Sequence, residues 1–279
     1  MNATDDWYTV TELASGSYSI FEAEDYGQFL IEGTERSVLV DAGTGVGDLG
    51  SVVSDLVDTP VTLVLTHTHW DHIGAAAQFD DVFVSPIELP ADGRVRIDSL
   101  STEFVQRPTQ FTNHHVANGG SLPDGLSPDD HAVEPVEASP LPPDEGVDLG
   151  DRTLEVIPFP GHSPGHFGLL DPATNTLYGG DVIHMEKNLY VMFEDSNLED
   201  YIESMERLRD LRDEEALDVL VTSHNDPMSG VDLSLIDDLL SGLREIAADE
   251  REYEVVGTDW GEARSYEIGP STIMTKTGI

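Results

Sequence analysis

A group of histidines placed directly after a buried strand is the feature that most constrains this chain. The apolar run 61–66 (VTLVLT) predicts a buried strand, and the sequence HTHWDH follows it at once. Because side chains alternate along a strand, His67 and His69 leave the sheet on the same side, and the helix that follows presents Asp71 and His72. Imidazole and carboxylate groups suit Zn²⁺, Mn²⁺ or Fe²⁺. The spacing therefore predicts a metal site at the C-terminal end of a strand, where open α/β sheets place their sites.

Three further segments place ligand-type residues just past predicted strands. PGHSPGH, which contains His162 and His166, follows a strand that ends at residue 159. GGD, with Asp181, follows a strand that ends at residue 178, and SHN, with His224, follows the strand 219–222. The glycines beside these residues allow the backbone to approach a ligand closely. All the candidate ligands thus stand at strand ends.

In this order, HxHxDH, PGHSPGH, GGD and SH resemble the motifs of the metallo-β-lactamase fold superfamily, most of all its glyoxalase II-like and lactonase-like hydrolases. The resemblance covers nearly the whole chain, with residues 86–150 matched least. It implies an α/β fold, the four-layer αββα sandwich, with residues 1–279 in one domain and residues 86–150 as an insertion or lid over the metal site.

The resemblance also implies a set of ligands. Seven residues would hold two metals: His67, His69 and His162 the first, Asp71, His72 and His224 the second, and Asp181 both. Asp41, in the segment VLVDAGTG, matches an early aspartate of the family that supports ligands without binding metal.

The expected activity is hydrolysis. Two cations would lie roughly 3.5–4 Å apart, share one water and lower its pKa towards about 7. Zn²⁺ is the simplest choice, with iron or manganese as alternatives. We expect the metal-bound hydroxide to attack the carbonyl of a small ester, thioester or lactone. A mononuclear iron enzyme of the persulfide dioxygenase type keeps the same HxHxDH motif and stays an alternative.

The residues expected to act in catalysis are Asp71, Asp181 and His184. His184 stands three residues after Asp181, where lactonase-like relatives carry a tyrosine donor. It either donates a hydrogen bond to the oxyanion or only packs. Tyr190 is the fallback donor, although core packing is its simpler role.

The other histidines have plainer interpretations. His166 is expected to be structural and His131 to be exposed in its acidic stretch. His114 and His115 lie in the insertion, where a surface or packing role is the simpler interpretation and a substrate contact the alternative.

The pattern of the rest of the chain is α/β. Short apolar runs separated by turn residues predict strands at 8–13, 18–23, 29–32, 37–40, 61–66, 82–85, 154–159, 166–170, 176–179 and 219–222. Apolar residues at helical spacing predict helices at 49–56, 74–79, 198–211 and 233–247, and residues 252–268 alternate like a strand or hairpin.

The net charge of the chain limits the kinds of molecule that it can bind. Subtracting 55 acidic from 13 basic residues gives a net charge of −42, which repels nucleic acid and anionic membranes. The chain has no cysteine, no secretory signal and no apolar run of membrane-spanning length, so we expect a cytoplasmic protein that acts on a small molecule. The acid-rich, lysine-poor composition resembles that of proteins from extreme halophiles. Few basic residues follow residue 247, which disfavours a glutathione thioester; the oligomeric state is open.

Overall fold

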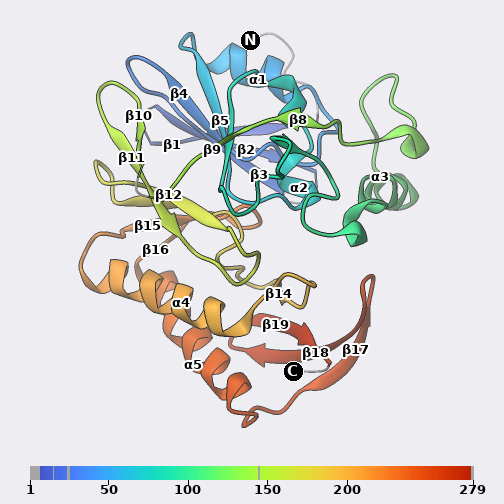
Figure 1. Ribbon diagram of the computed structural model, residues 1–279, viewed down its shortest axis with the longest axis vertical. Coiled ribbons are helices and arrows are strands. Elements are labelled where there is room, and N and C mark those ends of the chain that lie inside the picture. Colours follow the sequence, from blue (N-terminus) through green and yellow to red (C-terminus); the bar gives the residue numbers. More distant parts are fainter. Residues whose placement is uncertain (1–6, 15, 24–25, 144, 278–279) are drawn as a thin grey trace. The chain divides into compact units, whose positions relative to one another are not determined.

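The computed structural model describes residues 7–14, 16–23, 26–143 and 145–277 (Figure 1). Contacts divide the chain into two compact units, unit 1 with residues 1–142 and 147–153 and unit 2 with residues 143–146 and 154–279. That the whole chain behaves as one domain stays a prediction.

Unit 1 is built on a mixed sheet. Its strand order is β1 (Thr9–Ala14), β2 (Ser17–Glu22), β3 (Tyr26–Ile31), β4 (Ser37–Val40), β5 (Val61–Leu65), β6 (Val82–Val84) and β9 (Ser139–Pro140). The first four strands pair antiparallel, whereas β4, β5, β6 and β9 pair parallel. The C-terminal ends of the parallel strands lie at the same end of the sheet, and the histidine motif directly follows β5 there.

Two helices join these strands. Helix α1 (Leu49–Leu56) begins at Asp48, whose carboxylate accepts the Ser51 N–H at 3.0 Å. Helix α2 (Trp70–Ile73) begins earlier than the predicted helix 74–79, where only the 3₁₀ turn η1 (Ala76–Gln78) forms. The loop after β4 ends α2 at Ile73, because the N–H groups of Gly74 and Ala75 donate to the carbonyls of Gly43 and Ala42 at 2.8 and 3.0 Å rather than to carbonyls within α2. A Cβ on Gly74 would lie 2.1 Å from the backbone of Thr44, so only glycine fits there.

The segment 86–150 contains short elements within unit 1. They are β7 (Arg94–Val95), η2 (Thr102–Phe104), α3 (Arg107–Ala117), η3 (Pro128–Asp130), β8 (Val136–Glu137), β9 and β10 (Val147–Asp148). The Thr112 hydroxyl donates to the Pro128 carbonyl at 2.7 Å and ties α3 to η3. The segment therefore contains short helices rather than an extended loop.

Unit 2 contains two groups of strands. One runs in the order β11 (Thr153–Pro158), β12 (Phe167–Asp171), β13 (Thr176–Tyr178), β15 (Val219–Val221) and β16 (Met228–Ser229). The other runs β14 (Asn188–Val191), β19 (Ser271–Lys276), β18 (Gly261–Ile268) and β17 (Glu254–Thr258). Strands β14 and β19, which the sequence pattern did not predict, pair parallel to each other.

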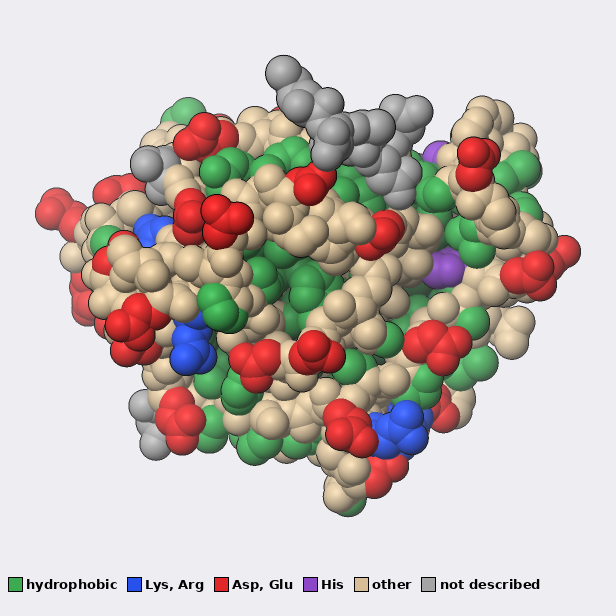
Figure 2. All heavy atoms as spheres, turned by 90° about the horizontal axis from the view of Figure 1, so that it is seen from above, with side chains coloured by type: hydrophobic (Ala, Val, Ile, Leu, Met, Phe, Trp, Pro, Cys, Tyr) green, Lys and Arg blue, Asp and Glu red, His purple; other side chains and the backbone are tan. Residues whose placement is uncertain are grey.

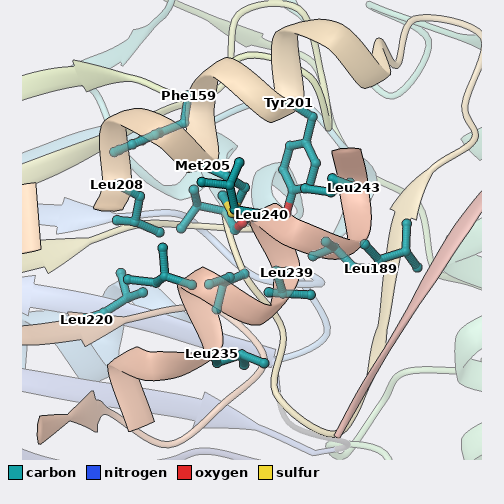
Figure 3. Close-up of a cluster of buried hydrophobic side chains, with 14 of the residues drawn as sticks. Phe159, Leu189, Tyr201, Met205, Leu208, Leu220, Leu235, Leu239, Leu240 and Leu243 are labelled. Atoms are coloured by element: carbon teal, nitrogen blue, oxygen red, sulfur yellow. Dashed lines mark hydrogen bonds between the residues drawn. The ribbon is translucent and has the colours of Figure 1, made fainter. Parts of the chain in front are cut away.

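The core of unit 2 lies around helices α4 (Leu198–Asp213) and α5 (Leu235–Ala247), the latter preceded by the 3₁₀ helix η4 (Gly230–Ser234). Figure 3 shows the apolar faces of both helices in this cluster, with Tyr201 and Met205 from α4 and Leu239 and Leu243 from α5. All four side chains are fully buried. Full burial of a large apolar side chain stabilises a fold by roughly 1.5–3 kcal/mol, so this cluster contributes strongly to the stability of unit 2.

The surface carries the charge imbalance of the sequence. On the face drawn in Figure 2, Asp and Glu side chains far outnumber Lys and Arg. Among the described residues, none of the helices combines the length and the apolar character that a membrane crossing requires.

Candidate metal centre

Unit 1 brings together the residues of the HxHxDH motif, which we call the unit 1 cluster (His67, His69, Asp71 and His72). The imidazole rings of His67 and His69 are 4.5 Å apart, and those of His67 and His72 are 4.0 Å apart. Asp71 Oδ1 lies 4.0 Å from His72 Nε2. All three histidines are buried. The strand end and the start of α2 thus gather the four side chains as the spacing predicted.

Asp41 orients two of these histidines through one hydrogen-bonded chain. Its Oδ2 accepts from His72 Nδ1 at 2.8 Å, and its Oδ1 accepts from the Thr66 backbone N–H at 2.8 Å. The Thr66 hydroxyl donates to the same carboxylate, so its oxygen accepts from His67 Nδ1 at 3.1 Å. Both rings therefore carry a proton on Nδ1, which in the neutral imidazole leaves a lone pair on Nε2. This is the supporting role that the resemblance implied for Asp41.

Asp41 occupies an unusual backbone conformation. Its φ of 64° lies in the left-handed region, where Asp and Asn are enriched among non-glycine residues. The turn aims its carboxylate back at β5. The local sequence at the end of β4 is therefore part of the site.

The insertion supplies a second carboxylate, which the sequence analysis missed. Glu88 is 2% exposed and accepts from the backbone N–H and the hydroxyl of Thr68 at 2.7 and 3.0 Å. Phe104, also from the insertion, places its ring 4.6 Å from the ring of His69. The residue between the two histidines is thus held in place by residues 86–150. No sequence motif marks Glu88, so sequence analysis had no signal by which to find it.

Unit 2 brings together a second group, which we call the unit 2 cluster (His162, Asp181, His184 and His224). The two oxygens of Asp181 face different imidazoles. Oδ2 lies 3.5 Å from His162 Nε2, whereas Oδ1 lies 3.5 Å from His184 Nε2 and 3.3 Å from His224 Nε2. The aspartate therefore stands between two sets of nitrogen atoms, as a carboxylate that serves two cations would.

Strand β14 orients two histidines of this cluster. The Tyr190 carbonyl accepts from His162 Nδ1 at 2.7 Å, and the Asn188 carbonyl accepts from His184 Nδ1 at 2.8 Å. These carbonyls belong to alternate residues, so they point to the same side of the strand. Because a carbonyl can only accept, both imidazoles carry their proton on Nδ1.

His166 has a different role from its neighbour in PGHSPGH. Its Nε2 accepts the backbone N–H of Asp181 at 3.0 Å. The ring therefore fixes the backbone that carries Asp181, as expected for a structural histidine. Gly161, with φ 127°, lets the chain pass Tyr201, since a Cβ there would lie 2.4 Å from it.

The nitrogen and oxygen atoms of the unit 2 cluster suit a divalent metal as ligands. In the unit 2 cluster, the Nε2 lone pairs of His162 and His184 face the carboxylate oxygens of Asp181 at 3.5 Å. Two acceptors at this distance in a buried site repel each other, and a cation between them converts the repulsion into attraction. Metal-binding histidines almost always donate their other ring N–H to a carboxylate or carbonyl, as these do. The residues present therefore fit the metal that the motif predicts.

The remaining histidines differ from one another. His131, expected to be exposed, is buried: its Nε2 bonds the Thr44 carbonyl at 2.9 Å, and burial lowers its pKa. That expectation was wrong because the acidic neighbours of His131 in the sequence do not surround it in space. His114 is exposed, and His115 packs its ring 5.1 Å from that of Trp7. The ring of Tyr190 packs against Phe193.

A further buried carboxylate lies beside the loop that follows Asp41. Glu22 accepts from the Thr44 backbone N–H at 3.0 Å and from the Trp7 indole N–H at 3.1 Å, and the Thr44 hydroxyl also donates to it. Burial nevertheless raises the pKa of Glu22 to about 7, with a smaller contribution from the charge of Asp71. Glu22 thus titrates near neutral pH, beside the cluster rather than in it.

The fold and these clusters define a class of protein, the metal-dependent hydrolases whose ligands stand at strand ends of an α/β sandwich. The chain belongs to the metallo-beta-lactamase superfamily, whose family model matches residues 28–224. This match confirms the predicted family, the predicted fold class and the prediction of an enzyme, a metal-dependent hydrolase.

Individual relatives add detail. The chain is 28% identical over 238 residues to acyl-coenzyme A thioesterase MBLAC2 of Gallus gallus, covering 78% of this chain and 81% of that protein. It is 25% identical over 150 residues to hydroxyacylglutathione hydrolase GloC of Haemophilus influenzae, covering 53% and 62%. A solved metallo-beta-lactamase from Pontibacter korlensis superposes with a TM-score of 0.57 at 21% identity, covering 85% and 99%, which shows the shared fold.

Proposed function

We propose that this protein hydrolyses small acyl thioesters with two zinc ions. One ion would be held by His67, His69 and His162, the other by Asp71, His72 and His224, and Asp181 would bridge them. This assignment follows the order of the family's motifs.

The observation that carries the proposal is the shared protonation of four histidines. His67, His72, His162 and His184 all commit Nδ1 to an acceptor, through Thr66, Asp41, Tyr190 and Asn188 respectively. In the neutral rings this leaves the lone pair on Nε2, the atom through which each imidazole would bind a metal. Histidines that only pack have no reason to share one tautomer, whereas metal ligands do.

The residues have separate tasks in this proposal. When bound, a pair of divalent cations polarises the substrate carbonyl and lowers the pKa of water to near neutrality. The hydrogen bonds of Asp41 and Thr66 hold the imidazoles of His67 and His72 in place. Glu88 fixes Thr68 between the ligands. These contacts are formed before any substrate binds, so the site needs little rearrangement on binding.

The thioester class is inferred from relatives and from leaving-group chemistry. The curated relatives described above are named as enzymes that act on an acyl-coenzyme A or a hydroxyacylglutathione, and both are thioesters. A thiol has a pKa of about 8.5, so a thiolate leaves without a proton donor beside it. The unit 2 cluster suits such a leaving group, because in their neutral form the two imidazoles whose tautomer is set offer no proton on Nε2.

The test is metal analysis joined to a substrate panel. Purified protein should contain two equivalents of zinc and cleave an acyl-CoA thioester faster than a hydroxyacylglutathione, a lactone or a phosphodiester, in molar KCl, where the Debye length is about 3 Å. Chelation should abolish activity, and Zn²⁺ should restore it. Iron as the sole metal with oxygen consumption would instead favour the dioxygenase alternative, and a preference for lactones would contradict the thioester class.

We also infer that the acidic surface adapts the protein to high salt. The net charge of −42 is spread along the whole chain, and charges of one sign repel one another in the folded state. Salt at roughly 1 M screens that repulsion. Circular dichroism melts should show a Tm that rises from millimolar to molar KCl; an unchanged Tm would contradict this inference.

A further inference from the structure

We propose that His184 is itself a metal ligand, so that Asp181, His184 and His224 form a three-residue site within unit 2. The proposal rests on the proposed function only in assuming that the protein holds metal. It adds an eighth ligand to the seven that the motifs supply. It also replaces both roles expected for His184, the oxyanion donor and the packing residue.

The first argument is the protonation of the ring. His184 Nδ1 lies 2.8 Å from the Asn188 carbonyl, which can only accept, so the proton of the neutral imidazole is on Nδ1. The opposite nitrogen, Nε2, then has a lone pair and no hydrogen. In the neutral ring this nitrogen therefore binds a cation rather than donating to an oxyanion.

The second argument is the surroundings of that nitrogen. His184 is 3% exposed, and its Nε2 has no hydrogen-bond donor within reach among the described residues. The atom instead lies 3.5 Å from Asp181 Oδ1, and the ring of His184 is 4.7 Å from the ring of His224. A buried lone pair that faces a carboxylate is unfavourable unless a proton or a metal cation lies between them, and the second imidazole of His224 beside the same carboxylate favours the metal.

The third argument is the cluster as a whole. The ligand atoms of Asp181, His184 and His224 all lie within 4.8 Å of one another. Two imidazoles and one carboxylate are a donor set suited to Zn²⁺, Mn²⁺ or Fe²⁺.

The fourth argument is the likeness of His184 to His162. Both rings are anchored by carbonyls of alternate residues in β14, at 2.8 and 2.7 Å, and both direct Nε2 to Asp181 at 3.5 Å. The backbone around His184 is held as well, since the Ser271 hydroxyl donates to its carbonyl at 2.7 Å. A side chain that only filled space would not need the geometry of a ligand.

The experiment measures metal affinity apart from activity. Full-length wild-type protein, His184→Phe and His184→Ala would be titrated with Co²⁺, following the visible absorption of the bound ion, and with Zn²⁺ in competition with a coloured chelator. His114→Gln removes an exposed imidazole from α3 and serves as the matched control. Loss of groups that merely support a ligand costs about 10–100-fold in affinity, so loss of the ligand should weaken one equivalent at least about tenfold.

Added imidazole provides a second readout. It should enter the space left by His184→Ala and restore both the affinity and the Co²⁺ spectrum, but it should not change His184→Phe. Circular dichroism of the metal-free variants controls for folding.

Other outcomes overturn the inference. Unchanged affinity and spectrum with a lower kcat would make His184 an oxyanion donor, and unchanged affinity with a lower Tm of the metal-free protein would make it a packing residue. A wild-type protein that binds neither Zn²⁺ nor Co²⁺ would overturn the proposed function as well, whereas normal binding by the wild type and both variants would overturn this inference alone.

Discussion

In unit 1 a buried carboxylate orients the histidines, whereas in unit 2 the backbone of a strand does so. Asp41 holds His72 directly and His67 through Thr66. In unit 2 the acceptors are the carbonyls of Asn188 and Tyr190. A side-chain acceptor can be lost by one substitution, but a carbonyl remains whatever the side chain is. The unit 1 cluster should therefore be more sensitive to substitution of its supporting residues than the unit 2 cluster.

The largest effect is expected at Asp181, the centre of the unit 2 cluster. Asp181→Asn keeps the shape and removes the charge that faces His162, His184 and His224. We expect the loss of one metal equivalent and a fall in kcat of about 10³-fold, because stabilisation of several kcal/mol is lost. Metal analysis and steady-state kinetics measure both, with the exposed Asp55→Asn as the control. A fully active Asp181→Asn protein would contradict a bridging role.

The next largest effect is expected at Glu22, the buried carboxylate of unit 1 that lies beside the cluster rather than in it. The carboxyl of Glu22 has a pKa of 4.5 in its ordinary state and about 7 in the folded protein. Between pH 4.5 and 7 the folded protein therefore keeps a proton on Glu22 that the unfolded chain has lost. Stability should therefore fall as pH rises from 4.5 to 7, by on the order of 3 kcal/mol, and this loss should be absent in Glu22→Gln. Urea melts across this range, compared with the exposed Glu12→Gln, measure the difference. Parallel curves for wild type and Glu22→Gln would show that Glu22 is ionised throughout.

A smaller effect on affinity is expected at Asp41. Asn tolerates the left-handed φ of 64° at this position, so Asp41→Asn tests the hydrogen bonds rather than the backbone. Its amide group cannot accept from both Thr66 and His72, and metal affinity should fall by about 10–100-fold. Thr66→Val removes the acceptor of His67 and one donor to Asp41 but leaves the bond between Asp41 and His72, so it should cost less. Zinc competition titrations decide this, and equal affinities in wild type and Asp41→Asn would remove Asp41 from the site.

The smallest effect is expected on β14. Asn188→Ala removes a side chain that bonds the Tyr190 hydroxyl at 3.3 Å, but it leaves the carbonyl that His184 uses. Metal affinity should change by less than about twofold, the size typical of a surface substitution. The same zinc titration applies. A loss as large as that of Asp41→Asn would show that the two units do not differ in this respect.

Much of the fold could be predicted from local sequence, for a definite reason. Strand β4 and helix α1 have the predicted bounds, because buried apolar runs and helical spacing leave a periodic signal. Helix α2 was displaced because its neighbours Gly74 and Ala75 bond a distant loop. Strand β14 was missed because its four residues pair with β19, which follows about 80 residues later and is absent from any local window.

The sequence by itself determined which chemistry the chain presents. Imidazole and carboxylate groups at strand ends are a property of residue type and order, so HxHxDH, PGHSPGH, GGD and SH could be read directly. Only the tertiary structure decided how those groups are oriented and protonated. The acceptors that set the tautomers are Asp41, Thr66 and two backbone carbonyls of β14. A carbonyl has the same chemistry in every residue, so no sequence pattern can mark the one that turns His184 towards Asp181.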